Sequence, residues 1–118
     1  MGEVFEFNQK KFFSLEDARD LLPLVRRVTT HAQKQVQNLT TQINLVQGKS
    51  KKAALEARIH AYFDAWKVKM QKLGCDPKGM WLVDFDKGDG YYCWHYPEGD
   101  IKYHHGYLDG YRGRTKIH

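Results

Sequence analysis

The chain has 118 residues, of which 42% are hydrophobic and 14% aromatic, and its formal net charge is +5. This length is typical of one domain, so residues 1–118 are interpreted as a single domain. No apolar run approaches the about 20 residues that a membrane span needs, which argues against a membrane protein. Glu3 and Glu6 argue against a signal peptide. With only two cysteines, Cys75 and Cys93, the chain is expected to be a reduced cytoplasmic protein.

The net positive charge permits an anionic partner such as nucleic acid or a phosphate ligand. A soluble protein with a modest excess of lysine is the simpler explanation of the same charge. Composition alone therefore leaves the kind of partner open.

The first segment, residues 1–13, alternates apolar and polar side chains at 5–8, which predicts an edge strand or an ordered arm. A helix is predicted to begin after Ser14, because Ser14 and Asp17 have the spacing of a capping box. Apolar residues then recur every three or four positions as far as Val46, as they do along a coiled-coil seam.

A second helix is predicted at about 51–73, because Gly48 suits the end of one helix and Ser50 the start of the next. The short connection makes the two helices antiparallel neighbours, so residues 14–74 predict a long, coiled-coil-like helical hairpin. The half of this hairpin that is distant from its ends has too little of its own chain to bury its seam. We expect that half to pack against a second copy, giving a homodimer.

The period of the apolar pattern changes to two within residues 78–118. Turn residues separate three short strands, at 80–85, 91–96 and 101–105. The sequence thus predicts an α+β fold, in which a small three-stranded antiparallel β-meander follows the helical hairpin.

Four-residue loops set the expected register of this meander, and the register sorts side chains into two faces. Asp84 is expected opposite Cys93 in the first β-hairpin, and Cys93 opposite His104 in the second. One face is then aromatic and is expected to lie under the first helix: Trp81, Val83, Phe85, Tyr92, Trp94, Tyr96, Ile101 and Tyr103.

The other face brings together four donor groups of the kind that bind zinc: Asp84, Cys93, His95 and His104. They predict a zinc site, although a solvated face that happens to hold histidines explains them too, because no Cys-x-x-Cys spacing accompanies them. A thiol enzyme is another alternative, with Cys93 as nucleophile, His95 or His104 as base and Asp84 orienting the base. No helix N-terminus lies behind Cys93 to stabilise a thiolate.

The C-terminal tail, residues 106–114, combines tyrosine and arginine with several glycines. Arg112 and Arg114 are suited to hold a phosphate or a carboxylate, and an aromatic neighbour such as Tyr111 is suited to stack on a base. The alternative is that an arginine pairs with Asp84, Asp86 or Asp109 and ties the tail down.

Several short motifs follow one another along the chain: Phe13-Ser14-Leu15-Glu16-Asp17-Ala18, Leu21-Leu22-Pro23, Gly79, Leu82-Val83-Asp84-Phe85, Cys93-Trp94, His104-His105-Gly106, Gly110-Tyr111 and Gly113-Arg114. Their order resembles a bacterial family known as domain of unknown function 2203, over residues 12–118. The resemblance implies the architecture and the motif positions, but no reaction, because the family has no established activity. It draws attention to one set of residues: Asp84, Cys93, Trp94, His105 and Arg114.

Together with the tail, this set gives the candidate ligand-binding residues Trp94, His105, Tyr111, Arg112 and Arg114. In the expected register His105 falls on the aromatic face, away from the donors of the other face.

The sequence is consistent with three different functions. The leading interpretation is a non-enzymatic binding or assembly module that dimerises through its helical hairpin. The first alternative is a small metal-dependent or thiol enzyme on the polar face of the sheet. The second is a binder of nucleic acid or a phosphate ligand that uses the tyrosine and arginine tail.

Overall fold

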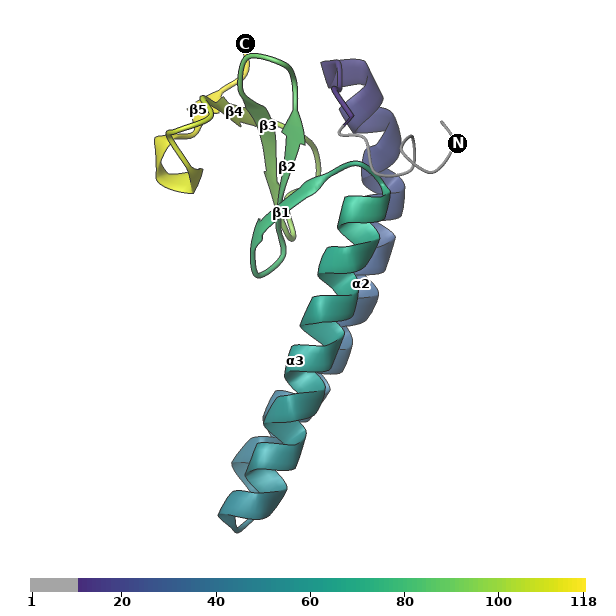
Figure 1. Ribbon diagram of the computed structural model, residues 1–118, viewed down its shortest axis with the longest axis vertical. Helices are drawn as coiled ribbons and strands as arrows, with labels where there is room; N and C mark the ends of the chain where they lie inside the picture. The colour runs from purple at the N-terminus through teal and green to yellow at the C-terminus, as the bar shows by residue number, and fades with distance from the viewer. Residues whose placement is uncertain (1–10) are drawn as a thin grey trace, which may run out of the picture.

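A computed structural model describes residues 11–118, so the strand predicted at 5–8 lies outside the described residues. Two long helices run side by side, and a five-stranded antiparallel sheet lies beside one end of the pair (Figure 1). The predicted α+β fold and its helical hairpin are confirmed. Within residues 11–118, no helix combines the length and the apolar character needed to cross a membrane.

Helix α2 (Leu15–Leu45) begins with the predicted capping box. The Ser14 hydroxyl accepts a hydrogen bond from the Asp17 amide at 3.0 Å, and the Asp17 carboxylate accepts one from the Ser14 amide at 3.4 Å. The buried side of α2 follows the predicted seam: Ala18, Leu22, Val25, Thr29, Ala32, Val36 and Leu39.

Helix α3 (Lys49–Lys72) begins two residues earlier than predicted, directly after Gly48. Its buried residues, Trp66 and Met70, both lie in its C-terminal half. The indole nitrogen of Trp66 donates a hydrogen bond to the Thr29 hydroxyl at 2.8 Å and so joins the two helices next to the sheet. The hairpin is therefore well packed near the sheet, and its other half projects from the body of the molecule (Figure 1). Packing of that half against a second copy stays a prediction.

The strands pair with their neighbours in sequence order: β1 (Asp76–Gly79), β2 (Leu82–Asp86), β3 (Tyr91–His95), β4 (Tyr103–His105) and β5 (Thr115–Lys116). The prediction of three strands was incomplete, since β1 and β5 extend the sheet at its edges. Neither carries a strand signal of its own, because β1 reads Asp-Pro-Lys-Gly and β5 has two residues. Both form through pairing with a neighbouring strand.

The register of the first β-hairpin is as predicted, with Asp84 opposite Cys93. The predicted register of the second is wrong by one residue, because Cys93 pairs with Tyr103 and not with His104. Pairing between β3 and β4 ends at Cys93 and Tyr103, so the segment that connects the paired residues is longer than the four residues predicted. Since a slip of one residue exchanges the two faces of a strand, His105 and Tyr103 join the face of Cys93 and His104 moves to the other.

The aromatic face of the sheet packs against the helices, as predicted for its central residues. Val83, Phe85, Trp94 and Ile101 are buried in one cluster with the start of α2. Trp81 meets Trp66 of α3 edge to face, with ring centroids 5.0 Å apart. The polar face of the sheet therefore lies on the side away from the hairpin.

Candidate metal centre

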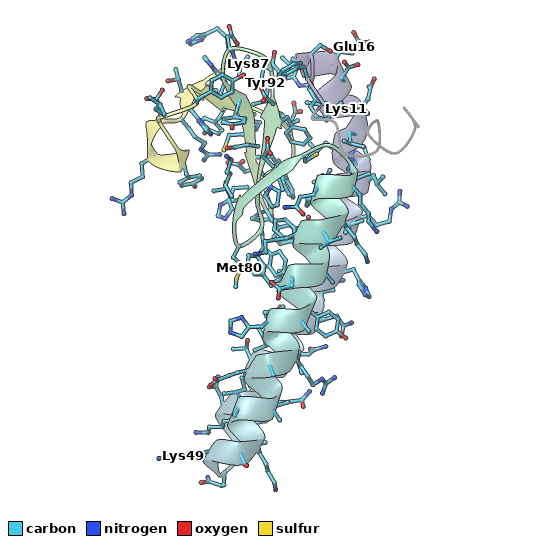
Figure 2. The ribbon with its side chains drawn as sticks, in the orientation of Figure 1. Lys11, Glu16, Lys49, Met80, Lys87 and Tyr92 are labelled. Carbon is cyan, nitrogen blue, oxygen red and sulfur yellow. The ribbon has the colours of Figure 1, made fainter. Side chains whose placement is uncertain are left out.

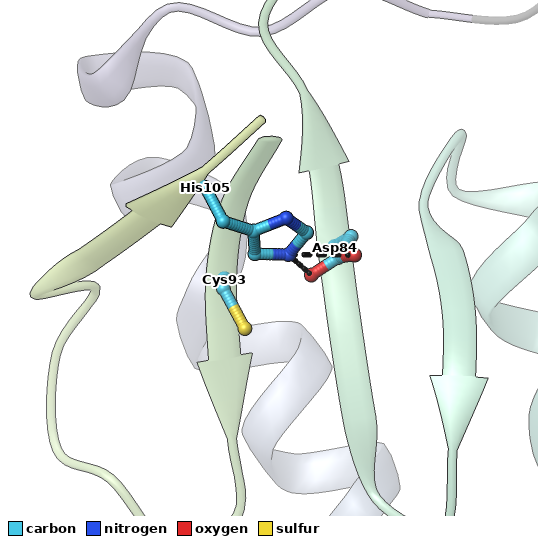
Figure 3. A group of neighbouring side chains, drawn as sticks. All are labelled: Asp84, Cys93 and His105. Carbon is cyan, nitrogen blue, oxygen red and sulfur yellow. Dashed lines mark hydrogen bonds and ion pairs between the residues drawn. The ribbon is translucent and has the colours of Figure 1, made fainter. Parts of the chain in front are cut away.

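Three side chains of different strands meet on the polar face of the sheet: Asp84 of β2, Cys93 of β3 and His105 of β4 (Figure 3). One potential ligand atom from each lies within 4.8 Å of the others. All three are buried, with relative exposures of 2% for Asp84, 0% for Cys93 and 5% for His105. Within residues 11–118, this is the one group of at least three histidine, cysteine or carboxylate side chains that is compact enough to hold a metal ion.

The two ring nitrogens of His105 have different partners. Nδ1 lies 2.8 Å from the carbonyl oxygen of Gly106. A carbonyl only accepts, so Nδ1 carries a proton and donates it. Nε2 lies 3.1 Å from both carboxylate oxygens of Asp84. In the neutral ring Nε2 is then an acceptor that faces two further acceptors, and a proton or a metal ion is needed between them.

Burial dominates the acid–base properties of the other two groups. It raises the pKa of the Asp84 carboxyl, against the opposing effects of His105, of a hydrogen bond from Cys93 and of the charge of Lys78. Burial, reinforced by the negative charge of Asp84, raises the pKa of the Cys93 thiol to about 12. A thiol of this pKa is protonated at neutral pH and is a poor nucleophile, which weakens the thiol-enzyme alternative.

Arg114 from the tail lies close enough to Cys93 to oppose the rise in the pKa of its thiol, and it also has other partners. It donates hydrogen bonds of 3.0 and 2.9 Å to the two carboxylate oxygens of Glu98. Its guanidinium carbon lies 4.1 Å from the ring centroid of Tyr103 and 4.2 Å from that of Tyr111. An arginine therefore does tie the tail down, but its partner is Glu98 and not one of the three aspartates expected.

The remaining predicted site residues lie apart from the three donors. His95 faces Tyr111, with ring centroids 5.3 Å apart, and His104 lies on the opposite face, paired with Tyr92. Trp94 is buried on the aromatic face, where its indole nitrogen donates to the Glu98 carbonyl at 2.7 Å. Arg112 is exposed in the short helix η1 (Tyr111–Gly113).

Lys78 and Tyr91 complete the surroundings of the three donors and were not singled out from the sequence. The Tyr91 ring lies 5.4 Å from that of His105, and the ammonium group of Lys78 lies 4.6 Å from the Tyr91 ring centroid. Tyr91 was detectable, because it lies two residues from Cys93 on the same face of β3. Lys78 was not, because it belongs to β1, which has no strand pattern.

A model of a family described as an uncharacterized conserved protein, DUF2203, matches residues 11–117. The chain belongs to this family. The match extends from before the Ser14 cap to the last strand, so the resemblance inferred from the short motifs is confirmed. No curated protein and no solved structure matches the chain. Since the DUF2203 description names no reaction, the chemistry of this member has to be inferred from its own side chains.

Proposed function

We propose that this DUF2203 protein is a non-enzymatic metal-binding module that holds one transition-metal ion, in the first place Zn²⁺, between Asp84, Cys93 and His105. The observation that supports it is the orientation of His105, whose Nδ1 donates to the Gly106 carbonyl while Nε2 points at the Asp84 carboxylate. Metal-bound histidines have this arrangement, in which a backbone carbonyl holds one nitrogen and leaves the lone pair of the other for the metal.

The three donors suit zinc in type, spacing and charge. Carboxylate oxygen, imidazole nitrogen and thiolate sulfur are all common zinc ligands. Zinc bonds of about 2.0–2.3 Å place tetrahedral ligand atoms roughly 3.3–3.8 Å apart, so a group already within 4.8 Å needs only small side-chain adjustments. Zn²⁺ with a carboxylate, a thiolate and a neutral imidazole has no net charge, which suits a buried site.

A structural role agrees with the position of the donors at the centre of the sheet. The ion would link β2, β3 and β4, and the free energy of its binding would add to the stability of a small domain. A metal-dependent enzyme is the second candidate, because three protein ligands leave one tetrahedral position for water, as in catalytic zinc sites.

Metal analysis of protein purified without a histidine tag tests the proposal. We expect about one equivalent of zinc, and with Co²⁺ a thiolate-to-metal charge-transfer absorption. Two matched pairs of variants locate the site: His105→Gln and Cys93→Ser should lose the metal, whereas His104→Gln and Cys75→Ser should keep it. His104 is adjacent to His105 on β4 but lies on the opposite face, and Cys75 is the other buried thiol.

Less than about 0.2 equivalents of zinc after loading with excess metal would contradict the proposal. So would equal metal contents in His104→Gln and His105→Gln. If the cobalt spectrum changes when azide or imidazole is added, the fourth position is open and the enzyme becomes the stronger candidate.

A further inference from the structure

The charge of the chain is divided unevenly between its two parts. We define the basic arm as residues 21–74, the hairpin beyond the acidic first turns of α2. It has two acidic residues and ten basic ones: Arg26, Arg27, Lys34, Lys49, Lys51, Lys52, Arg58, Lys67, Lys69 and Lys72. The arm therefore has a net charge of +8, whereas the rest of the chain, with nine basic and twelve acidic residues, has −3.

Within residues 11–118, most of the charged side chains of the basic arm form no ion pair. All ten except Lys67 are exposed. Within the described residues, Lys67 is also the only one of the ten with an ion pair, 3.7 Å from Asp64. Basic residues elsewhere do have partners, such as Arg19 with Asp100 at 3.2 Å and Lys87 with Asp89 at 2.7 Å. The helix dipole accounts for Lys69 and Lys72 in the last turn of α3, but not for the other charges.

Several of the charges share one side of the arm. Four lie on one face of α3, because they follow one another at spacings of seven, eleven and three residues: Lys51, Arg58, Lys69 and Lys72. Lys69 lines a cavity of about 130 Å³ between the helices, together with His31 of α2. Arg27 and Lys34 lie four and three residues from His31, on the same face of α2. Lys69 is the one charged residue that lines this cavity, and Arg27 and Lys34 lie near it along α2.

We propose that the basic arm binds the phosphate backbone of a nucleic-acid duplex. At 1.5 Å per residue the part of α2 from Arg26 to Leu45 extends about 29 Å. The basic residues run from Arg26 to Lys49, which lies at the tip (Figure 2), and back along α3 to Lys72. A line of charge this long suits an extended polyanion better than a small phosphate. A duplex has about one negative charge per 1.7 Å, and exposed lysine and arginine side chains contact phosphates without reading bases.

The arm, and not the C-terminal tail, is thus the surface proposed to bind nucleic acid. In the tail Arg114 is bound to Glu98 and stacked on two tyrosine rings. An anionic membrane is the competing partner of a basic helix, but helices that lie on membranes also present a continuous apolar face. The exposed large apolar residues of the arm are single and far apart: Leu24, Leu45 and Val68.

Fluorescence anisotropy with a labelled DNA duplex of about 20 base pairs, longer than the arm, tests the proposal. The test variant carries Arg27→Gln, Lys34→Gln and Arg58→Gln, and the control carries Lys102→Gln, Arg112→Gln and Lys116→Gln. Both remove three exposed charges, one set from the arm and the other from the sheet and tail. Circular dichroism establishes that both variants keep their helix content.

For the unmodified protein we expect a dissociation constant of about 1–100 µM at physiological salt, weakening steeply as salt is raised. The arm variant should bind at least about ten-fold more weakly, with a salt slope shallower by roughly two to three, whereas the control should change less than about two-fold. Equal losses in both variants, binding that is independent of salt, or binding to phosphatidylserine vesicles but not to the duplex would each overturn the proposal.

Discussion

At the scale of single residues, the carboxyl of Asp84 gives the clearest dependence on pH. Its folded-state pKa is raised above the ordinary 3.8, chiefly by burial. The metal-free folded protein therefore keeps a proton that the unfolded chain has already lost. The stability that this bound proton contributes is fully present at pH values below the pKa of Asp84 in the unfolded chain. It is lost as the pH rises through the pKa of Asp84 in the folded protein.

We predict that with a chelator present the free energy of unfolding falls as pH rises through this window, which begins near 3.8. The substitution Asp84→Asn should remove this fall in the free energy of unfolding. With zinc present the sign should reverse, because metal binding requires the ionised carboxylate. Urea unfolding at a series of pH values measures all three cases, and identical pH dependence in the metal-free protein and in Asp84→Asn would show that this assignment is wrong.

At the scale of elements, the structure was predictable where neighbouring residues decide it. The capping box at Ser14 and the apolar period of α2 are local signals, and both gave the right helix. The short turn between β2 and β3 likewise set the correct pairing of Asp84 with Cys93. Two of the three donors of the candidate metal centre were therefore identified from the sequence together with their positions on adjacent strands.

The third donor, His105, was singled out by the family resemblance but was placed on the wrong face, because the connection from β3 to β4 is not a simple four-residue loop. Glu98 accepts from the His95 amide at 2.8 Å through its side chain, and its own amide donates to the His95 carbonyl at 2.8 Å. These bonds start the turn before the ladder would otherwise end, which shifts β4 by one residue. His104 and His105 then exchange faces, and no periodic pattern in the sequence signals that exchange.

Glu98 is accordingly predicted to hold the second turn and the tail together. Glu98→Ala removes the two hydrogen bonds from Arg114 and the one from the His95 amide. With relative side-chain exposures of 24% for Glu98 and 12% for Arg114, the pair is partly buried, so we expect a loss of about 1–3 kcal/mol in the free energy of unfolding.

The matched control for this prediction is Glu98→Gln, which keeps an oxygen to accept from the His95 amide and removes only the charge. It should cost less than Glu98→Ala when both are measured by urea unfolding. A change of under about 0.5 kcal/mol for Glu98→Ala would mean that the tail is held by stacking on Tyr103 and Tyr111 instead.

At the scale of the whole molecule, the predicted association through the hairpin and the proposed binding of a polyanion would compete for the same part of the molecule. In the half of α3 distant from the sheet, Leu55 and Ile59 are only partly buried, which favours a second copy there. Two copies would, however, bring two arms of net charge +8 together. Their repulsion is screened by salt, with a Debye length of about 10 Å at 0.1 M and about 3 Å at 1 M.

We therefore predict that homodimer formation strengthens as salt rises, while binding to a duplex weakens. Sedimentation velocity at micromolar protein should give a larger dimer fraction at about 0.5 M salt than at about 0.05 M, since screening removes the repulsion but leaves the apolar contacts. Replacing Leu55 and Ile59 by alanine should lower the dimer fraction at both salt concentrations. A monomer at high salt would argue against the dimer without affecting the duplex, because the exposed charges of a single arm suffice for phosphate contacts.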